Sequence, residues 1–478
     1  MESLTSLREI QQQLKSGTTT CSQLVASCLH NIDSNSHLNA FLEVYREEAL
    51  EKAQLLDKKI AQGTAGRLAG LVVGLKDMLC YQDHALQAGS KILEGFESQF
   101  NGTAVQRLLA EDAIIIGRQN CDEFGMGSSN ENSAFGPVRN GLDPDRVPGG
   151  SSGGSAVAVQ KAMCHVSIGS DTGGSVRQPA AFTGIIGIKP TYSRISRYGL
   201  ISYASSFDTI GILSGNLENN ALVLEIIAGP DEYDSTVSKN TVPEFSLLGN
   251  QPAARIGYIK ESLEADGVQS EVKERTGEML DQLREMGHEV TPVEFPLIDY
   301  VLPTYYLLTT AEASSNLSRY DGVKYGYRSK DEETLDSFYK HTRSEGFGKE
   351  VLKRIMLGTF VLSASYYDAY YTKAQKVRRL IKEKTKELFD HYDFIVLPTA
   401  PTTAFELGRF ADDPLEMYHS DLFTVPASVS GNPAISIPNG FDKDGLPVGF
   451  QIIADDFNEQ GLYNLSKDII KQKENQLV

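Results

Sequence analysis

The sequence predicts an α/β fold whose strands are buried on both faces. From residue 71 onward, short apolar runs rich in β-branched residues alternate with helical stretches, which is typical of a sheet between helices. The same alternation returns after a more charged and more helical middle part. A chain of 478 residues with 41% hydrophobic residues is also long enough to bury a large core.

We interpret residues 1–478 as a single domain with four segments. Residues 1–62 are predicted to form N-terminal helices, and residues 63–230 contain two unusual glycine–serine clusters. Residues 231–390 are predicted to be a mostly helical insert, after which residues 391–478 return to the sheet. No fixed-period repeat or low-complexity tract divides the chain.

The N-terminal segment has apolar residues at helical spacing. One stripe contains Leu4, Leu7, Ile10 and Leu14, and the pattern continues with Leu24, Leu29 and Ile32. Such a stripe either packs into the core of the same chain or provides a docking surface for a partner, and the pattern fits both.

The second segment is predicted to contain four strands, at residues 71–73, 114–117, 166–168 and 184–188. Helices are predicted near residues 103–111 and over 216–228, where Gly229 and Pro230 provide a stop signal.

The insert is predicted to contain a helix over residues 269–286 and a long helical segment over 351–388. The apolar stripe of the first helix consists of Val272, Met279, Leu280 and Leu283. Strands are then predicted at residues 394–397, 434–437 and 448–453, before a last helix over 457–472.

Charge and cysteine content narrow the possible functions. The formal net charge of −18 should repel phosphate backbones, so we expect another subunit to hold any nucleic acid. Five cysteines without CxxC spacing are atypical of a disulfide framework and indicate a reducing compartment. We find no apolar signal-peptide core and no apolar run of about 18 residues, so we expect a cytoplasmic protein with no membrane contact.

The two glycine–serine clusters, at residues 149–155 and 169–175, indicate a site. Glycine-rich turns let the backbone approach a ligand and direct several N–H groups toward it. If Ser175 attacks a carbonyl, the N–H groups of Thr172, Gly173 and Gly174 are natural donors to the developing oxyanion. Flexible loops or a phosphate cradle are the alternative interpretations.

A serine nucleophile needs a base, because its hydroxyl is weak at neutral pH. None of the eight histidines lies in a convincing motif, and His165 is interpreted as a packed core residue. Lys76 follows an apolar run, where desolvation would lower its pKa and favour the neutral amine. A solvated lysine at a strand end is the alternative.

The runs GGSSGGSAVAV and SDTGGSVRQPAAFTGIIGIKPT closely resemble the amidase-signature family. That resemblance implies a mixed central sheet covered by helices on both faces, and a Ser–cis-Ser–Lys triad. It assigns Ser175 as nucleophile, Ser151 as the bridging serine after a cis peptide bond, and Lys76 in VVGLKDML as the base. No metal is implied.

Further stretches resemble one branch of the family, the A subunits of glutamyl-tRNA(Gln) amidotransferases. Among them are NCDEFGMGSSNENSAFGPVRN and RSEGFGKEVLKRIMLGTF. The resemblance implies that the amide donor is glutamine, held by Arg354 at its α-carboxylate and by Asp421 at its α-ammonium. A nearby tyrosine is expected to help, with Tyr305 preferred over Tyr306. For Arg354 the alternative is a surface position on a charged helix.

The same resemblance implies a heterotrimer completed by the B and C subunits of the amidotransferase. Ammonia would pass through a tunnel to the B subunit, where misacylated Glu-tRNA(Gln) is activated with ATP and Mg²⁺ and then amidated. This chain would itself need no cofactor for glutamine hydrolysis. The N-terminal helices would be candidates for contact with these partners.

Two positions depart from the family pattern. The family often has proline where this chain has Ile212, and an Ala-Phe pair where it has Ser202 and Tyr203. Because neither position belongs to the predicted triad, we expect these departures to affect packing and not the reaction.

Other functions would use different parts of the sequence. An α/β-hydrolase elbow would use Ser152 in a GxSxG pattern, and a penicillin-recognising enzyme would use the SxxK pattern from Ser270 to Lys273. A non-enzymatic scaffold predicts the loss of a triad residue, yet all three are present. A stand-alone amidase for another carboxamide is the remaining alternative.

Overall fold

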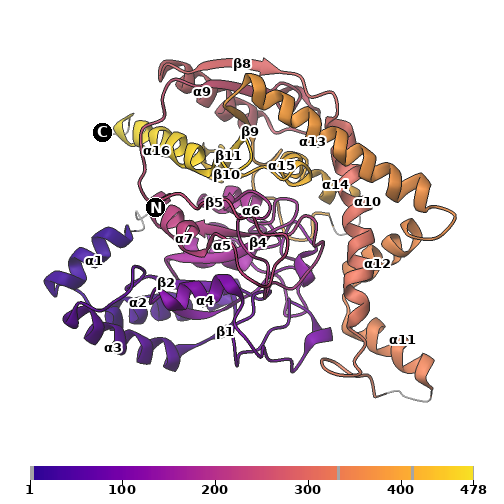
Figure 1. Cartoon of the computed structure of the whole chain (residues 1–478), viewed down its shortest axis with the longest axis horizontal. Coiled ribbons are helices and arrows are strands. Elements are labelled where there is room, and N and C mark those ends of the chain that lie inside the picture. Colours follow the sequence, from indigo (N-terminus) through magenta and orange to yellow (C-terminus); the bar gives the residue numbers. More distant parts are fainter. Residues whose placement is uncertain (1–4, 331–333, 411–413, 477–478) are drawn as a thin grey trace.

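The computed structural model describes residues 5–330, 334–410 and 414–476, and within them eleven strands form one mixed sheet (Figure 1). Their order across the sheet is β1-β3-β2-β4-β6-β5-β10-β11-β9-β7-β8. The strands are β1 (Phe41–Val44), β2 (Val72–Lys76), β3 (Ile114–Gln119), β4 (Val166–Asp171), β5 (Ile186–Lys189), β6 (Thr209–Ser214), β7 (Arg255–Ile259), β8 (Glu289–Val293), β9 (Phe394–Pro398), β10 (Ala434–Phe441) and β11 (Pro447–Ala454).

The sheet is mixed because its neighbouring strands run in both relative directions. Strand β2 is parallel to both β3 and β4, whereas β6 is antiparallel to β4 and β5. The pair β10–β11 is antiparallel and connects β5 to β9. Every residue of β2, β3, β4, β6 and β11 is buried, as expected for strands covered on both faces.

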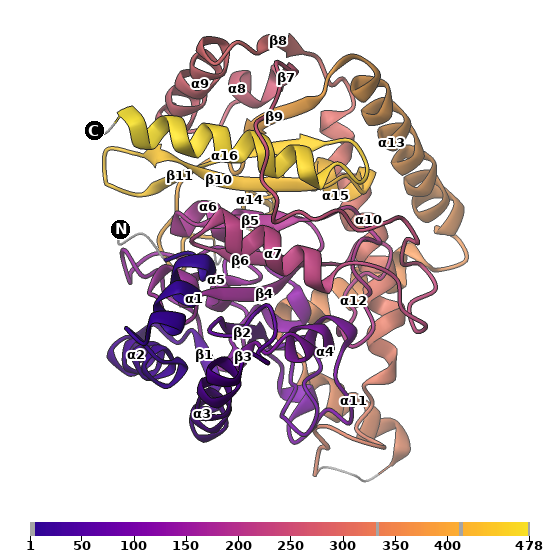
Figure 2. The same ribbon diagram turned by 60° about the vertical axis from the view of Figure 1, so that its left-hand side comes forward.

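Helices cover both faces of this sheet (Figure 2). Helices α5 and α6 pack on its central strands, while α7 and α16 contact each other and, respectively, β6 and β11. The helices are α1 (Leu7–Ser16), α2 (Cys21–Ser34), α3 (Arg46–Gln62), α4 (Thr103–Ala110), α5 (Gly153–Gln160), α6 (Arg177–Thr183), α7 (Leu217–Ile227), α8 (Glu261–Glu264), α9 (Ser270–Glu285), α10 (Ile298–Asn316), α11 (Leu335–Gly346), α12 (Lys349–Val361), α13 (Lys373–His391), α14 (Pro414–His419), α15 (Val425–Ser430) and α16 (Glu459–Gln476).

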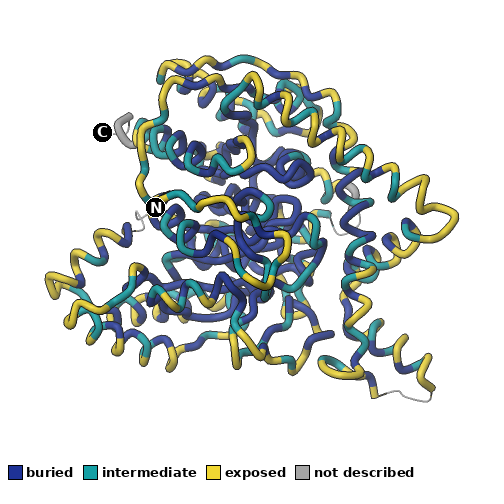
Figure 3. The backbone as a smooth tube through the Cα atoms, in the orientation of Figure 1, coloured by how far each residue is buried: buried dark blue, intermediate teal, exposed yellow. Residues whose placement is uncertain are grey.

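Burial follows this layering. The tube in Figure 3 is dark blue along the central strands, whereas the outer helices have exposed stripes. Helix α1 has Leu7, Ile10 and Leu14 buried, and the Leu7 N–H donates to Asn219 Oδ1 at 2.7 Å. The apolar stripe of α1 therefore packs into the core of its own chain. Leu4, the first residue of the predicted stripe, lies outside the described residues.

The predicted insert contributes to the sheet as well as to its cover. Strands β7 and β8 lie in it and extend the sheet beyond β9. Their partly exposed sequences RIGYI and EVTPV lack the continuous apolar run that identifies a buried strand. The predicted helical segment over 351–388 is broken only at residues 362–366, because α12 ends at Val361 and a π-helical stretch, Tyr367–Thr372, leads directly into α13.

Helices α10 to α13 form a long arm along one side of the molecule in Figures 1 and 2. Helix α10 packs against both α12 and α13. Among the described residues, we find no helix that is both long and apolar enough to cross a membrane.

Candidate active site

The first glycine–serine turn lies between β3 and α5 and contains a cis peptide bond between Gly150 and Ser151. Gly154, where this turn leads into α5, packs so closely against the main chain after β3 that no side chain fits there. A Cβ atom on Gly154 would lie 2.3 Å from the carbonyl oxygen of Asn120. The close approach fixes the turn, and with it Ser151, against the end of β3.

Lys76 is the last residue of β2 and is completely buried. Its Nζ donates to Ser151 Oγ at 2.7 Å and to Ser170 Oγ at 2.9 Å. A third bond, at 3.0 Å, reaches Ser152 Oγ. Desolvation lowers the pKa of Lys76, because the buried ammonium ion loses its hydration. The alternative of a solvated lysine is therefore wrong.

Ser175 lies in the second glycine–serine turn, between β4 and α6, and is 8% exposed. The two turns are joined through the main chain, because the Ser152 N–H donates to the Ser175 carbonyl oxygen at 3.1 Å. Ser175 is thus held next to Ser152, and the neighbouring Ser151 accepts a hydrogen bond from Lys76. All three predicted triad residues are brought into one buried region.

A buried ion pair anchors the second turn. Asp171 Oδ1 lies 2.9 Å from Arg177 Nη2, and both side chains are inaccessible to solvent. The same carboxylate accepts the Gly174 N–H at 2.8 Å. The Gly174 N–H is therefore not free to donate to an oxyanion. Among the described residues, the N–H groups of Thr172 and Gly173 donate to no carboxylate, so they remain the predicted oxyanion donors.

Arg354 lies on α12 and is only 4% exposed, so the surface alternative is wrong. Its Nε donates to Glu350 Oε1 at 2.8 Å and its Nη1 donates to Tyr203 Oη at 3.0 Å. The rings of Tyr203, Tyr306 and Tyr418 surround the guanidinium, with centroids 5.5–5.7 Å from its carbon.

A cavity of about 220 Å³ opens beside Arg354. Its lining includes Glu350, Tyr418 and Ser129, whose buried hydroxyl has no hydrogen-bond partner among the described residues. A guanidinium beside a cavity is suited to bind an anionic group.

Asp421 is buried a few residues before α15. Its Oδ2 accepts the hydroxyls of Ser128 at 2.6 Å and Tyr306 at 3.2 Å. Burial raises the pKa of Asp421 to about 7, partly offset by those hydrogen bonds and by Arg354. A carboxylate in this environment gains most from a bound cation.

The two tyrosines of α10 contribute to different parts of the site. Tyr306 contacts Asp421, whereas Tyr305 lies against the second turn, with its Oη 2.5 Å from where a Cβ on Gly173 would be. The hydroxyl beside the predicted ammonium site is therefore that of Tyr306. Among the described residues, no hydrogen bond joins Tyr305 to Asp421 or Arg354, so the structure does not support the sequence-based preference for Tyr305.

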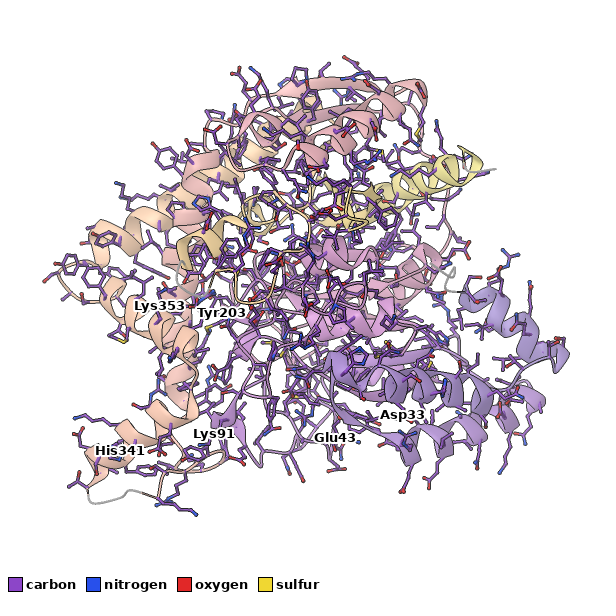
Figure 4. All side chains as sticks on the ribbon, turned by 180° about the vertical axis from the view of Figure 1, so that it is seen from behind. Asp33, Glu43, Lys91, Tyr203, His341 and Lys353 are labelled. Atoms are coloured by element: carbon purple, nitrogen blue, oxygen red, sulfur yellow. The ribbon has the colours of Figure 1, made fainter. Side chains whose placement is uncertain are left out.

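Several site residues were not predicted, namely Tyr203, Ser128 and Glu350. Of these three, only Tyr203 could have been noticed from the sequence, because it departs from the family pattern. In Figure 4, Tyr203 and Lys353 are both found where the arm of helices meets the central body. The Tyr203 hydroxyl accepts a hydrogen bond from Arg354, so this departure lies beside a predicted substrate-binding residue.

The rival motifs form no second catalytic group, although Ser152 also accepts a hydrogen bond from Lys76. Ser152 Oγ donates to the Ser170 carbonyl oxygen, and the His165 ring accepts the Val72 N–H at 3.0 Å. Burial lowers the pKa of His165 to about 4. On α9, Ser270 bonds to Glu271 and Lys273 to the Ala265 carbonyl oxygen, so the SxxK pattern forms no pair.

The described ranges contain no group of three or more His, Cys, Asp or Glu side chains arranged to hold a metal ion. The polar groups that converge here are instead an amine, hydroxyls, a guanidinium and a carboxylate. Such a set can activate a serine and orient a zwitterion.

Comparisons with known proteins agree with this chemistry. The sequence profile of the Amidase family matches residues 23–463. A protein of Chlorobium phaeobacteroides, named as the A subunit of glutamyl-tRNA(Gln) amidotransferase, is 50% identical over 477 residues, covering 98% of this chain and 99% of that protein. A second protein of that name, from Chlorobaculum tepidum, is 50% identical over 469 residues, covering 96% of each chain.

A solved structure is also similar. The crystal structure of the glutamyl-tRNA(Gln) amidotransferase A subunit from Thermotoga maritima superposes with a TM-score of 0.76 at 39% identity. The match covers 93% of this chain and 90% of that one.

Proposed function

This chain belongs to the amidase family, and on that premise we propose that it hydrolyses the carboxamide of glutamine as the A subunit of a tRNA-dependent amidotransferase. The observation that carries the chemistry is the buried Lys76 amine, 2.7 Å from Ser151 Oγ and beside the turn that holds Ser175. The relatives named above support the choice of glutamine and of the complex.

The proposed reaction is acyl transfer through Ser175. Neutral Lys76 accepts a proton from Ser151, which accepts one from Ser175 as its oxygen attacks the amide carbon. The N–H groups of Thr172 and Gly173 stabilise the oxyanion. The relay then returns a proton to the leaving nitrogen, so that ammonia departs, and water cleaves the acyl-enzyme by the same relay.

Glutamine is proposed to bind between Arg354 and Asp421. The planar guanidinium suits the α-carboxylate, and the carboxylate suits the α-ammonium. Burial of both side chains supports this assignment, since a charge that is partly desolvated gains most from a matched ligand charge. Tyr306 is included in this site because its hydroxyl contacts Asp421.

The proposed complex also contains the B and C subunits of the amidotransferase. The B subunit would hold Glu-tRNA(Gln), ATP and Mg²⁺, and would convert Glu-tRNA(Gln) to Gln-tRNA(Gln) with the ammonia released here. The net charge of −18 supports this division, because the chain itself would be repelled by tRNA phosphates.

The first experiment is to isolate the tagged chain gently from its own cells and measure ammonia released from glutamine. We expect two co-purifying proteins, and a rate that rises when misacylated tRNA and ATP are added. If the chain is active without partners and prefers another carboxamide, it is a stand-alone amidase. The proposed mechanism through Ser175 would then still hold, but the assignment to an amidotransferase would not. Absence of any amide hydrolysis in the complete complex would refute both.

A further inference from the structure

We infer that Tyr203 is a positioning residue, whose hydroxyl orients the Arg354 guanidinium for the α-carboxylate of the substrate. This inference rests on the proposed function and identifies a residue of this chain that supports the predicted carboxylate-binding arginine. Tyr203 is 1% exposed, and its hydroxyl is 3.0 Å from Arg354 Nη1. Its own sequence position lies 151 residues away from Arg354.

The direction of the hydrogen bonds fixes the role of this hydroxyl. Arg354 has only donors, so Tyr203 Oη accepts from it. Tyr203 then donates to Thr309 Oγ1 at 3.0 Å, and Thr309 donates to the Tyr305 carbonyl oxygen at 2.8 Å. The Tyr203 proton is used in the bond to Thr309, and the Thr309 proton is used in the bond to Tyr305. The lone pairs of the Tyr203 oxygen are therefore available to accept from Arg354.

The guanidinium is held from two sides. Glu350 accepts from Nε at 2.8 Å and Tyr203 accepts from Nη1, while no hydrogen bond among the described residues uses Nη2. Because the guanidinium is planar, two fixed N–H directions determine where the third nitrogen points. Phenylalanine at position 203 would keep the ring but remove one of these two constraints.

The main chain of Tyr203 is tied to the reacting turn. Its N–H donates to Asp208 Oδ2 at 2.9 Å, and Asp208 Oδ1 accepts the Thr172 hydroxyl at 2.7 Å. Tyr203 therefore contacts the carboxylate-binding arginine with its side chain and, through Asp208, the turn that contains Ser175. The distance between the substrate-binding arginine and the nucleophile is set partly through this residue.

The test is Tyr203→Phe, with KM and kcat measured for three amides in the complete complex. Glutamine and 5-amino-5-oxopentanoate have the carboxylate, whereas 4-aminobutanamide has the ammonium and lacks the carboxylate. We expect KM to rise about fivefold to tenfold for the first two, with kcat within about twofold. For 4-aminobutanamide we expect no change in kcat/KM.

Tyr463→Phe is the matched control, because Tyr463 is also fully buried and its hydroxyl donates to Asn220 Oδ1 at 2.8 Å, outside this site. It should leave KM unchanged for every substrate. Equal losses in the two variants, or an equal loss of 4-aminobutanamide turnover in Tyr203→Phe, would overturn the positioning role. An unchanged KM for glutamine would do the same. Failure of the proposed function is distinguishable, since the unsubstituted complex would then release no ammonia from glutamine.

Discussion

At Lys76, burial and hydrogen bonding act on the same amine. Burial disfavours the ammonium form, and the hydroxyls of Ser151 and Ser170 lie within 3 Å of Nζ without bringing a negative charge. The lowered pKa makes this lysine a better proton acceptor than a solvated one. Lys76 is desolvated because it is the last residue of a buried strand, a position that the sequence indicated.

Ser175→Ala should abolish glutamine hydrolysis, because the alanine has no oxygen to form the acyl-enzyme. We expect kcat to fall by at least about a thousandfold. The thermal unfolding midpoint should change little, since the turn is held by Asp171 and by main-chain bonds. Ammonia release at the normal rate would remove Ser175 from the mechanism.

The affinity for glutamine should depend on the ionisation of Asp421. Because burial raises the pKa of Asp421 to about 7, the carboxylate proposed to bind the ammonium is lost as the pH falls through this value. We expect KM to rise by up to about tenfold for each pH unit below it. Asp421→Asn should give a high KM with a flat pH profile, and a flat profile in the unsubstituted protein would contradict the assignment.

The residues of the site differ in how far sequence could reveal them. Ser151 and Ser175 follow from two long motifs, and Lys76 follows from the shorter run VVGLKDML, for which a solvated lysine was the alternative. The contact between Tyr203 and Arg354 could not be predicted, because it depends on the packing of α12 against a loop far away in the chain.

At the level of elements, most strands with a continuous apolar run were predicted, whereas β1, β6, β7 and β8 were not. Strands β2, β3, β4 and β9 are buried throughout and lie where the sequence indicated them. Strand β1 was missed because it is only four residues long and partly exposed, and β7 and β8 because they are partly exposed as well. Strand β6 was missed although every residue in it is buried.

Glycine substitutions in two helices should have opposite effects. On α5, a Cβ at Gly154 would meet main-chain atoms of Asn120 and Ala40 at 2.3–2.9 Å, whereas on α9 a Cβ at Gly277 would meet nothing within 4 Å. Gly154→Ala should cost about 1–3 kcal/mol or more in the free energy of unfolding. Gly277→Ala should be neutral or stabilising by up to about 1 kcal/mol.

Urea unfolding of the two variants under identical conditions measures this difference. Equal midpoints would mean that the contact between α5 and the end of β3 is looser than described. A loss of stability in Gly277→Ala would instead show that the exposed face of α9 is packed in solution.

Across the whole molecule, all five cysteines are free and buried. Burial raises the pKa of the Cys164 thiol to about 11 and that of Cys21 to about 12, so the reactive thiolate is scarce. Iodoacetamide should therefore leave glutamine hydrolysis unchanged and label no cysteine until the protein is unfolded. Mass spectrometry of labelled protein, before and after denaturation, measures this, and rapid inactivation would point to a thiol in the reaction.

Two kinds of residue in the predicted site come from different parts of the sequence. The triad and its turns come from residues 76–175, on β2, β4 and the turns beside them, whereas Tyr203, Arg354 and Asp421 belong to later segments. A mutation of Arg354, in the arm of helices, can thus alter substrate binding without replacing a residue of the proposed proton relay. Such a chain can acquire new substrates by gradual change, with its hydrolytic chemistry preserved at every step.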